Sequence, residues 1–326
     1  MSTLTINSYE LIPFNLKTKP LMQHYLEITP IELSDYTFAA NYIWLSNASG
    51  FYTIINNTFC LFILSSGELS MLLPPLGKLE DTLSATPICF EIMNAQNSSP
   101  YYSKIEYVHE AFLEAFVNSL EHGAEIFDSL ADYLIEKKLV DYIYMADDLI
   151  ELKGNSYHSK RNEINKFKKS YANVRTEVFE KEKHGDGILT LFNNWVQERT
   201  KYMPKAEVET FLDGIYFERF AIKRLIKDYD KLELIGLVLF IGDEIKGFTM
   251  GEKITDDTSS VLIEKTDFET FGCAQFIFRE FTKVLKATYN STYINVGDDM
   301  GFENLKKVKM SYRPKKLILK YTIYQK

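Results

Sequence analysis

The second half of the chain shows the clearer pattern of apolar and polar positions. Residues 173–181 alternate as a strand does, and two later segments place apolar residues at helical spacing on either side of Pro204, which cannot continue a helix. Dense apolar runs follow, with turns at residues 242–244 and 256–257. The pattern predicts a strand, two helices, a three-stranded antiparallel meander, a helix, a strand, a helix and a last strand, at residues 173–181, 185–203, 206–229, 232–241, 245–253, 259–264, 273–286, 292–296, 302–310 and 316–322.

The first half carries a fainter version of the same plan. Ser34 suits the N-cap of a helix, and polar pairs at 56–57 and 66–67 separate short apolar runs. The pattern predicts a helix, three strands of a meander, two further helices and a strand, at residues 36–44, 50–55, 59–64, 69–73, 111–120, 126–137 and 140–145.

The order of the predicted elements in the second half is similar to that of the GCN5-related N-acyltransferase (GNAT) fold. The fainter copy in the first half suggests a tandem. We therefore expect an α/β (α+β) protein of two tandem GNAT-like acyl-CoA N-acyltransferase domains, each with a mixed central sheet flanked by helices. The expected domains are residues 1–150 and 151–326, the second entered through a connecting helix at about 156–171.

Composition places the chain among folded proteins of a reducing compartment. Its 326 residues are 46% hydrophobic and 25% charged, which excludes disordered and collagen-like classes. The 3 cysteines are far apart and form neither a disulfide framework nor a CxxC metal site. No signal peptide and no run of about 20 apolar residues occurs, so we expect a cytoplasmic protein without an integral membrane segment.

Charge is distributed unevenly along the chain. The net charge is −8, yet every arginine follows residue 150, and basic residues are concentrated at 153–169 and 303–326. An acidic first half and a basic second half suggest that the second half faces an anionic partner such as tRNA or an anionic lipid headgroup. A solvated helix face followed by a basic tail is the alternative. The sequence does not indicate the oligomeric state.

Two motifs make a family resemblance specific. Residues 149–167 contain L-K-G-x-x-Y-H-x-K-R-N, and residues 295–321 contain D-x-G-x-x-x-L-x-x-x-K-x-S-Y-x-P. Together with residues 34–44 and the pair Glu264-Lys265, they resemble the family built on the C-terminal domain of phosphatidylglycerol lysyltransferase, whose stand-alone bacterial members mostly have no assigned function.

The resemblance implies kinship with Fem-type aminoacyltransferases. Characterised membrane-bound relatives move an amino acid from its tRNA ester to the glycerol hydroxyl of phosphatidylglycerol. Those relatives also carry a membrane-spanning flippase region, to which nothing in this sequence corresponds. The acceptor implied for this chain is therefore a hydroxyl or an amine of unspecified origin.

Three residues are candidates for catalysis. Glu264 ends a predicted strand close to the donor cleft of GNAT proteins, and Asp299 precedes a predicted helix, so either carboxylate could bind the ammonium of an amino acid or transfer a proton. His158 lies near the start of the connecting helix, for which Ser156 suits the N-cap, and could act as a general base. The alternatives are a salt bridge for Glu264, helix capping for Asp299 and a structural hydrogen bond for His158.

The candidate substrate-binding residues lie in the same motifs. Cations at a helix N-terminus suit phosphate or carboxylate, and the second basic segment, including Lys320, could line an anionic groove or form an exposed outer face. The full set is Lys153, Tyr157, Lys160, Arg161, Asn162, Lys265, Asn295, Lys309, Ser311, Tyr312 and Arg313. No metal site is expected. The sequence departs from its relatives at Val296-Gly297, where many have Arg-Glu, and at Lys306, where many have Arg.

Acetyl-CoA is disfavoured as the donor. The loop that would hold its pyrophosphate in GNAT enzymes reads D-F-E-T-F-G-C-A at residues 267–274, with one glycine, two acids and no basic residue. The expected function is therefore aminoacyl transfer from aminoacyl-tRNA or a similar activated donor, without a bound cofactor. A non-catalytic anion-binding or regulatory protein on the same fold is the alternative, ahead of an acyl-CoA N-acetyltransferase.

Overall fold

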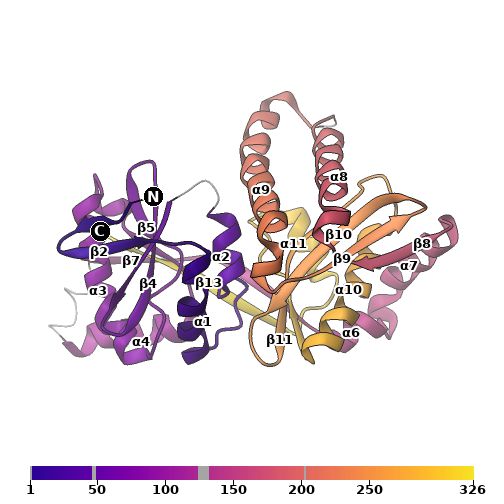
Figure 1. Ribbon diagram of the computed structural model, residues 1–326. Helices are drawn as coiled ribbons and strands as arrows, with labels where there is room; N and C mark the ends of the chain where they lie inside the picture. The colour runs from indigo at the N-terminus through magenta and orange to yellow at the C-terminus, as the bar shows by residue number, and fades with distance from the viewer. Residues whose placement is uncertain (1, 46–48, 124–131, 202) are drawn as a thin grey trace. The chain divides into compact units, whose positions relative to one another are not determined.

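A computed structural model describes residues 2–45, 49–123, 132–201 and 203–326. The chain is a mixed α/β protein, as predicted, and it divides into two compact units (Figure 1). The first unit comprises Met1–Asp141, Asp298–Gly301 and Ile318–Lys326, and the second comprises Tyr142–Gly297 and Phe302–Leu317. The sequence places the division near residue 150, whereas the first boundary between the units falls after Asp141, and the end of the chain belongs to the first unit.

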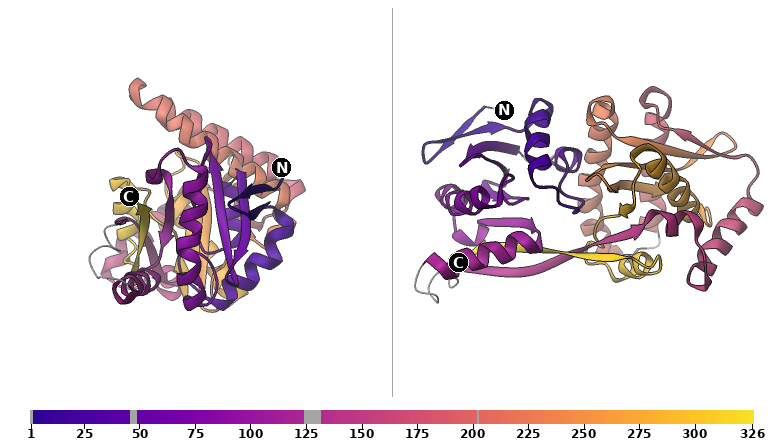
Figure 2. Two further views of the ribbon diagram at one scale, coloured as in Figure 1. Left: turned by 90° about the vertical axis from the view of Figure 1, so that its left-hand side faces the viewer. Right: turned by 90° about the horizontal axis from the view of Figure 1, so that it is seen from below.

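The first unit is built on a mixed sheet. Its strands follow the order β1-β2-β3-β4-β5-β6-β13-β7, and β5 pairs with β6 in parallel. The long strands β7 and β13 lie side by side (Figure 2), and each begins in one unit and ends in the other. The bounds are β1 Leu4–Ile6, β2 Tyr9–Pro13, β3 Ser49–Ile55, β4 Thr58–Ser65, β5 Glu68–Met71, β6 Lys104–Val108, β7 Tyr133–Met145 and β13 Lys316–Gln325.

Helices pack an apolar core against this sheet. Leu11, Phe62, Phe90, Phe112 and Ile323 are among its buried members, each no more than 2% exposed. The last of these comes from β13, which explains why the C-terminal residues belong to this unit. The helices are α1 Lys19–Ile28, α2 Phe38–Trp44, α3 Leu79–Gln96 and α4 Glu110–Gly123, with 3₁₀ turns at Leu16–Thr18 and Pro100–Tyr102.

Two predictions for this unit are wrong. Of the helix predicted at 126–137, residues 126–131 lie outside the described residues, and Tyr133–Met145 is a strand. Tyr133 and Ile135 both pack on the core, so that every second residue is used, as in a strand. Ser34 does not cap α2. The Thr37 hydroxyl does so instead, accepting a hydrogen bond of 3.1 Å from Ala40 N.

The second unit has a sheet with helices on both faces. Its strand order is β7-β12-β11-β10-β9-β8, in which β11 and β12 are parallel. The further strands are β8 Val174–Val178, β9 Ile235–Ile241, β10 Glu244–Lys253, β11 Thr258–Thr266 and β12 Tyr293–Asn295. The helices are α6 Ala146–Glu151, α7 His158–Ser170, α8 Lys181–Lys201, α9 Lys205–Leu232, α10 Cys273–Tyr289 and α11 Glu303–Met310, with a 3₁₀ turn at Asn155–Tyr157.

The two faces can be assigned from close contacts. A Cβ added to Gly247 of β10 would lie 3.3 Å from Ile277 of α10, and one added to Gly251 would lie 3.1 Å from Phe281 of the same helix. On the other face, Lys265 of β11 forms an ion pair of 2.9 Å with Glu218 of α9. Helix α10 therefore covers one face, and the long helices α8 and α9, which lie side by side in Figure 1, cover the other.

A bulge and an early end of pairing shape the middle of this sheet. The register of β10 with β11 shifts between Met250 and Gly251, so β11 accommodates one extra residue, Leu262, at that point. The parallel pairing of β11 with β12 ends at Ser260 with Asn295, whereas β11 continues to Thr266. Apart from the extra Leu262, residues 261–266 therefore have a strand partner in β10 but none in β12.

Gly251 is expected to tolerate no side chain. A Cβ there would lie 2.0 Å from the Ser260 carbonyl oxygen, so Gly251→Ala must separate β10 from β11 at the bulge. We expect a loss of about 2 kcal/mol or more in urea unfolding. Gly214→Ala is the matched control, because that glycine lies within α9 with open space around it. The control should gain up to about 1 kcal/mol, and equal behaviour of the two variants would contradict the prediction.

Candidate functional site

Glu264 lies on the stretch of β11 that continues beyond β12. Glu264 is paired with Thr249 of β10. Thr249 lies two residues before Gly251, which packs on α10, and residues two apart in a strand share a face. The side chains of Thr249 and Glu264 therefore both face α10. Glu264 Oε2 and Thr249 Oγ1 are buried, and neither has a hydrogen-bond partner of good geometry in the described residues. Buried polar atoms without partners are rare in folded proteins, and they are common where a ligand or a proton is handled.

The environment of Glu264 favours its protonated form. Burial raises the pKa of this carboxyl group to about 8, and the neighbouring Thr249 hydroxyl shifts it slightly in the opposite direction. Because water solvates the buried Oε2 poorly, the neutral acid is stabilised relative to the anion. A carboxyl group with a pKa near 8 can accept and return a proton at neutral pH.

Two neutral donors lie near this carboxylate. Burial is the main cause that raises the pKa of the Cys273 thiol and of the Tyr312 hydroxyl, and the charge of Glu264 adds to both shifts. Both groups therefore stay protonated at neutral pH. Lys160 Nζ lies 4.5 Å from the centre of the Tyr312 ring, and its side chain is buried. We call Glu264, Thr249, Cys273, Tyr312 and Lys160 the Glu264 cluster.

The structure places the other catalytic candidates differently. His158 is exposed at the first position of α7, and its ring lies 3.3 Å from the Asn162 side chain. No hydrogen bond or ion pair links His158 to Glu264 in the part of the chain that the structure describes. The expectation that Ser156 caps this helix is wrong, because Tyr157 occupies the N-cap and no side chain caps the helix.

Asp299 does not cap α11. That helix begins at Glu303 with Phe302 as its N-cap and without a side-chain cap. Asp299 Oδ1 instead accepts a hydrogen bond of 3.0 Å from Gly301 N, which closes a turn within the first unit. Its catalytic role stays a prediction.

Several cations expected to bind substrate instead contact other groups of the same chain. Arg161 donates to the carbonyls of Leu152 and Gly154, and Lys309 Nζ donates to those of Val296 at 2.6 Å and Gly297 at 3.0 Å. Lys153 pairs with Glu151 at 2.7 Å on the surface, and Lys265 pairs with Glu218 and lies 4.0 Å from the Trp195 ring. These contacts hold loops and helices in place.

The remaining candidates support the same region. Tyr157 donates a hydrogen bond of 3.0 Å to the Tyr312 carbonyl, and Ser311 Oγ donates one of 2.6 Å to the Val308 carbonyl. Asn295 is fully buried and accepts from Gly297 N at 2.7 Å. Arg313 is exposed, in a left-handed conformation. Of the candidates, the structure thus brings Glu264, Lys160, Tyr312 and Tyr157 together.

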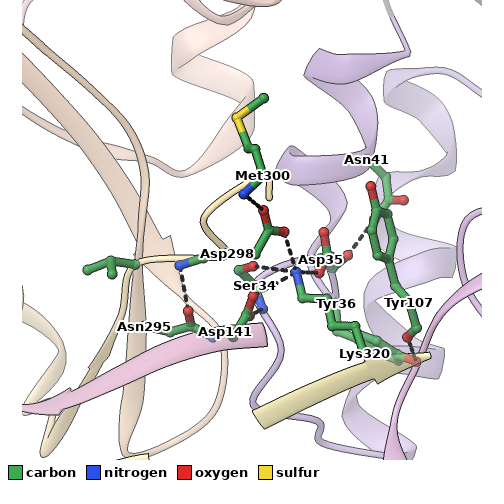
Figure 3. A network of polar contacts seen from close by, with 12 residues as sticks. Ser34, Asp35, Tyr36, Asn41, Tyr107, Asp141, Asn295, Asp298, Met300 and Lys320 are labelled. Carbon is green, nitrogen blue, oxygen red and sulfur yellow. Dashed lines mark hydrogen bonds and ion pairs between the residues drawn. The ribbon is translucent and has the colours of Figure 1, made fainter. Parts of the chain in front are cut away.

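Lys320 does not line a groove, contrary to the expectation from the second basic segment. It is 1% exposed and forms ion pairs with Asp35, with Asp141 at 2.7 Å and with Asp298 at 3.1 Å (Figure 3). Its Nζ also lies 3.4 Å from Ser34 Oγ. All five residues belong to the first unit. We call Lys320 and its three aspartates the Lys320 network.

Charge in the Lys320 network is unbalanced, because three carboxylates share one ammonium. Burial opposes the charge on Lys320, but the aspartates together raise its pKa well above the ordinary value. Burial also raises the pKa of Asp35 to about 6, against the effect of Lys320 and with added repulsion from Asp141 and Asp298. Asp35 therefore takes up a proton well before an exposed aspartate would as the pH falls.

Metal-ligand clusters, membrane-crossing helices and disulfide bonds are absent from the described residues. No group of three or more His, Cys, Asp or Glu side chains in those ranges is arranged to hold a metal ion. None of the helices in the same ranges combines the length and apolar character that a membrane crossing requires. The three cysteines are buried and free.

Comparison with known proteins places this chain in a family. The family described as phosphatidylglycerol lysyltransferase, C-terminal, matches residues 27–324. An uncharacterized protein of Mycoplasmoides gallisepticum is 24% identical over 193 residues, which span 58% of this chain and 58% of that protein. The match to this curated relative therefore covers little more than half its length.

Solved structures share the fold. A conserved protein of unknown function from Bacteroides thetaiotaomicron has a TM-score of 0.81 and 22% identity, over 99% of this chain and 100% of that one. L-PGS from Bacillus licheniformis has a TM-score of 0.64 and 16% identity, over 94% and 91%. A tandem GNAT protein from the clavulanic acid biosynthesis pathway has a TM-score of 0.50 and 7% identity, over 97% and 98%. The fold is that of two tandem GNAT-like domains, as predicted.

Proposed function

Because the chain belongs to the family of phosphatidylglycerol lysyltransferase C-terminal domains, we propose that it is an aminoacyltransferase. It would move an aminoacyl group from aminoacyl-tRNA, or from a similar activated donor, to a hydroxyl or amine acceptor. The single observation that carries this proposal is the buried Glu264 carboxyl group, with a pKa of about 8, on the stretch of β11 that continues beyond β12.

The proposed reaction uses Glu264 as a proton carrier. Glu264 takes the proton of the acceptor hydroxyl or amine while the acceptor oxygen or nitrogen attacks the ester carbonyl of the donor. The tetrahedral intermediate then collapses, the bond from the carbonyl carbon to the ribose oxygen breaks, and the proton passes from Glu264 to that oxygen. The neutral Tyr312 hydroxyl near Glu264 can stabilise negative charge that develops during these steps, whereas the Cys273 thiol donates to the Lys246 carbonyl at 3.1 Å.

The surroundings of α10 support a donor other than acetyl-CoA. Gly272 forms the N-cap of α10, where a GNAT enzyme would hold pyrophosphate, and a Cβ there would lie 2.7 Å from the Glu163 carbonyl of α7. The backbone of α7 thus covers this helix end. The adjoining loop carries Asp267 and Glu269, which would repel phosphate.

The proposed partner surface consists of exposed cations on α11 and in the segment that follows it. Lys307, Arg313 and Lys315 are exposed, and Lys306 is paired with Glu303 only at 3.9 Å. Anionic tRNA or a lipid headgroup would be attracted to such a segment, and the attraction would weaken with salt. Lys160, Arg161 and Lys309 are less suited to this role because their internal contacts occupy them.

A transfer assay tests the proposal. The purified chain is incubated with a total tRNA pool charged with radiolabelled amino acids, and anionic lipid vesicles or a cell extract supply acceptors. Label should appear in an acceptor, and heat-denatured protein should leave it on tRNA. If no label moves while salt-sensitive binding of tRNA or vesicles persists, the chain is a binding protein on an enzyme fold and the proposal fails.

A further inference from the structure

A cavity of about 740 Å³ lies in the second unit on the opposite side of the sheet from Glu264. Its walls come from α8, from strands β8, β9 and β10 with the turn between the last two, and from the loop that follows β11. A cavity of this size suits a small organic molecule. None of the residues proposed for catalysis lines it, so the cavity is a separate feature of the fold.

Aromatic rings form one part of the wall. Trp195 of α8 and Phe268 of the loop both line the cavity, and Phe268 is 54% exposed. The guanidinium carbon of Arg199 lies 5.8 Å from the centre of the Trp195 ring and 5.5 Å from that of the Phe268 ring, so one guanidinium group approaches both rings. Lys265 Nζ lies 4.0 Å from the Trp195 ring as well. These rings already attract cations, as electron-rich faces do.

The charged residues of the wall are mainly acidic. Five carboxylates face three Lys or Arg side chains there: Glu198, Asp243, Glu244, Asp267 and Glu269 against Arg175, Lys183 and Lys246. All three cations are occupied by ion pairs. Arg175 and Lys183 both pair with Glu177, and Lys246 lies between Glu244 at 2.9 Å and Asp267 at 2.8 Å.

Carboxylates beside the aromatic rings have weaker partners. Glu198 follows Trp195 by three residues on α8, so the two share one face of the helix. Its Oε2 is buried without a hydrogen bond, and Lys201 Nζ approaches only to 3.5 Å. Within the described ranges, the Glu269 carboxylate makes no ion pair or hydrogen bond. A cation from outside would therefore supply Glu269 with an ion-pair partner, in addition to the Arg199 and Lys265 cations that lie beside the rings.

We propose that this cavity binds a small organic ammonium ion. The ammonium group would lie among Glu198, Asp267 and Glu269, and its apolar chain would lie against Trp195 and Phe268. Asp267 and Glu269, which would repel a phosphate-bearing donor, would thus bind the ammonium group. The inference does not depend on the proposed transfer reaction, because the site is on the other face of the sheet.

Trp195 supplies a direct reporter of binding. The chain has 2 tryptophans, so Trp44→Phe leaves Trp195 as the only one. In this background, the fluorescence is followed while n-butylammonium chloride is added at constant ionic strength. Sodium butyrate, which has a similar length and the opposite charge, is the matched ligand. We expect a saturable change with butylammonium and none with butyrate, and calorimetry on the unmodified chain should give the same affinity.

Variants separate the proposed contacts from general charge. Glu198→Gln should weaken butylammonium binding about tenfold or more, since a charged hydrogen bond is lost, and Phe268→Ala should weaken it by a smaller factor. Asp256→Asn is the control, because that exposed aspartate pairs with Lys253 and does not line the cavity. Circular dichroism confirms that each variant is folded. Tighter binding of butyrate, no saturable binding, or an unchanged affinity in Glu198→Gln would overturn the proposal.

Discussion

The variant Glu264→Gln is expected to lose aminoacyl transfer by about 10²–10⁴-fold, the usual contribution of a positioned general base. Glutamine has the same size and shape but cannot take up the acceptor's proton. Since Glu264 Oε2 is buried without a good hydrogen-bond partner, the substitution leaves no charged group unpaired. The loss should therefore come from chemistry, with affinity for the donor tRNA nearly unchanged. Initial rates of label transfer at saturating tRNA provide the measurement.

The pH dependence gives this prediction a second readout. A base must be ionised, so the transfer rate should rise with pH through about 8, the pKa of Glu264, and level off above it. Stability should change in the opposite direction. The folded pKa lies above the ordinary value of 4.5, so the native state binds more protons and its stability falls as pH rises from about 4.5 through about 8.

The stability of Glu264→Gln, compared with that of a control variant, separates a loss of catalysis from a loss of folding. Glu264→Gln should be at least as stable as the unmodified chain at pH 8–9, because it removes a buried carboxylate that is costly to ionise. Glu209→Gln, at an exposed position within α9, is the control and should leave both rate and stability unchanged. A Glu264→Gln protein that keeps the full rate and the same pH profile would refute the role given to Glu264.

Local pattern predicted the second half of the fold well. Strand β10 was expected at 245–253 and is Glu244–Lys253, because a turn at Gly242 and an apolar run define it within a few residues. The strand at Tyr133–Lys137 could not be found in this way. It pairs with β13, almost two hundred residues later, and its apolar positions are compatible with either a helix or a strand until that partner is known.

The candidate site was also predictable only in part, because residues far apart in the sequence form it. Glu264 stands at the end of a strand, and its motif drew attention to it. Its neighbours Thr249, Cys273 and Tyr312 come from separate elements, so only the folded chain shows that they meet. Charge runs were less informative, because a sequence lists cations without the carbonyls and carboxylates, such as Glu218 beside Lys265, that occupy them.

Lys320→Met is expected to destabilise the first unit by about 3–5 kcal/mol at pH 7, the usual cost of removing one partner from a buried ion pair. Methionine matches the volume of lysine but leaves Asp35, Asp141 and Asp298 facing one another without a cation. Asp141 is fully buried and has no access to solvent. Urea unfolding monitored by circular dichroism measures the loss.

Lys104→Met is the matched control for a lysine of the same unit. Lys104 pairs with Glu106 at 2.8 Å on the neighbouring strand β6, but its side chain is 33% exposed, so the control should cost no more than about 1 kcal/mol. The effect of Lys320→Met should also shrink as the pH falls toward 4. Without the ammonium, the folded pKa of Asp35, already raised to about 6, rises further above the unfolded value, so the native state gains protons and recovers stability in acid.

A second variant tests the charge imbalance itself. Asp35→Asn removes one of three carboxylates that share Lys320, and it removes the group whose folded pKa is raised to about 6. Ionising Asp35 costs stability as pH rises from about 4 through about 6, so Asp35→Asn should lose that slope and be relatively more stable above pH 6 than below pH 4. If Lys320→Met unfolded like Lys104→Met at pH 7, and Asp35→Asn kept the original pH slope, the network would carry no significant charge coupling, and Lys320 would act only as an apolar stem within the core.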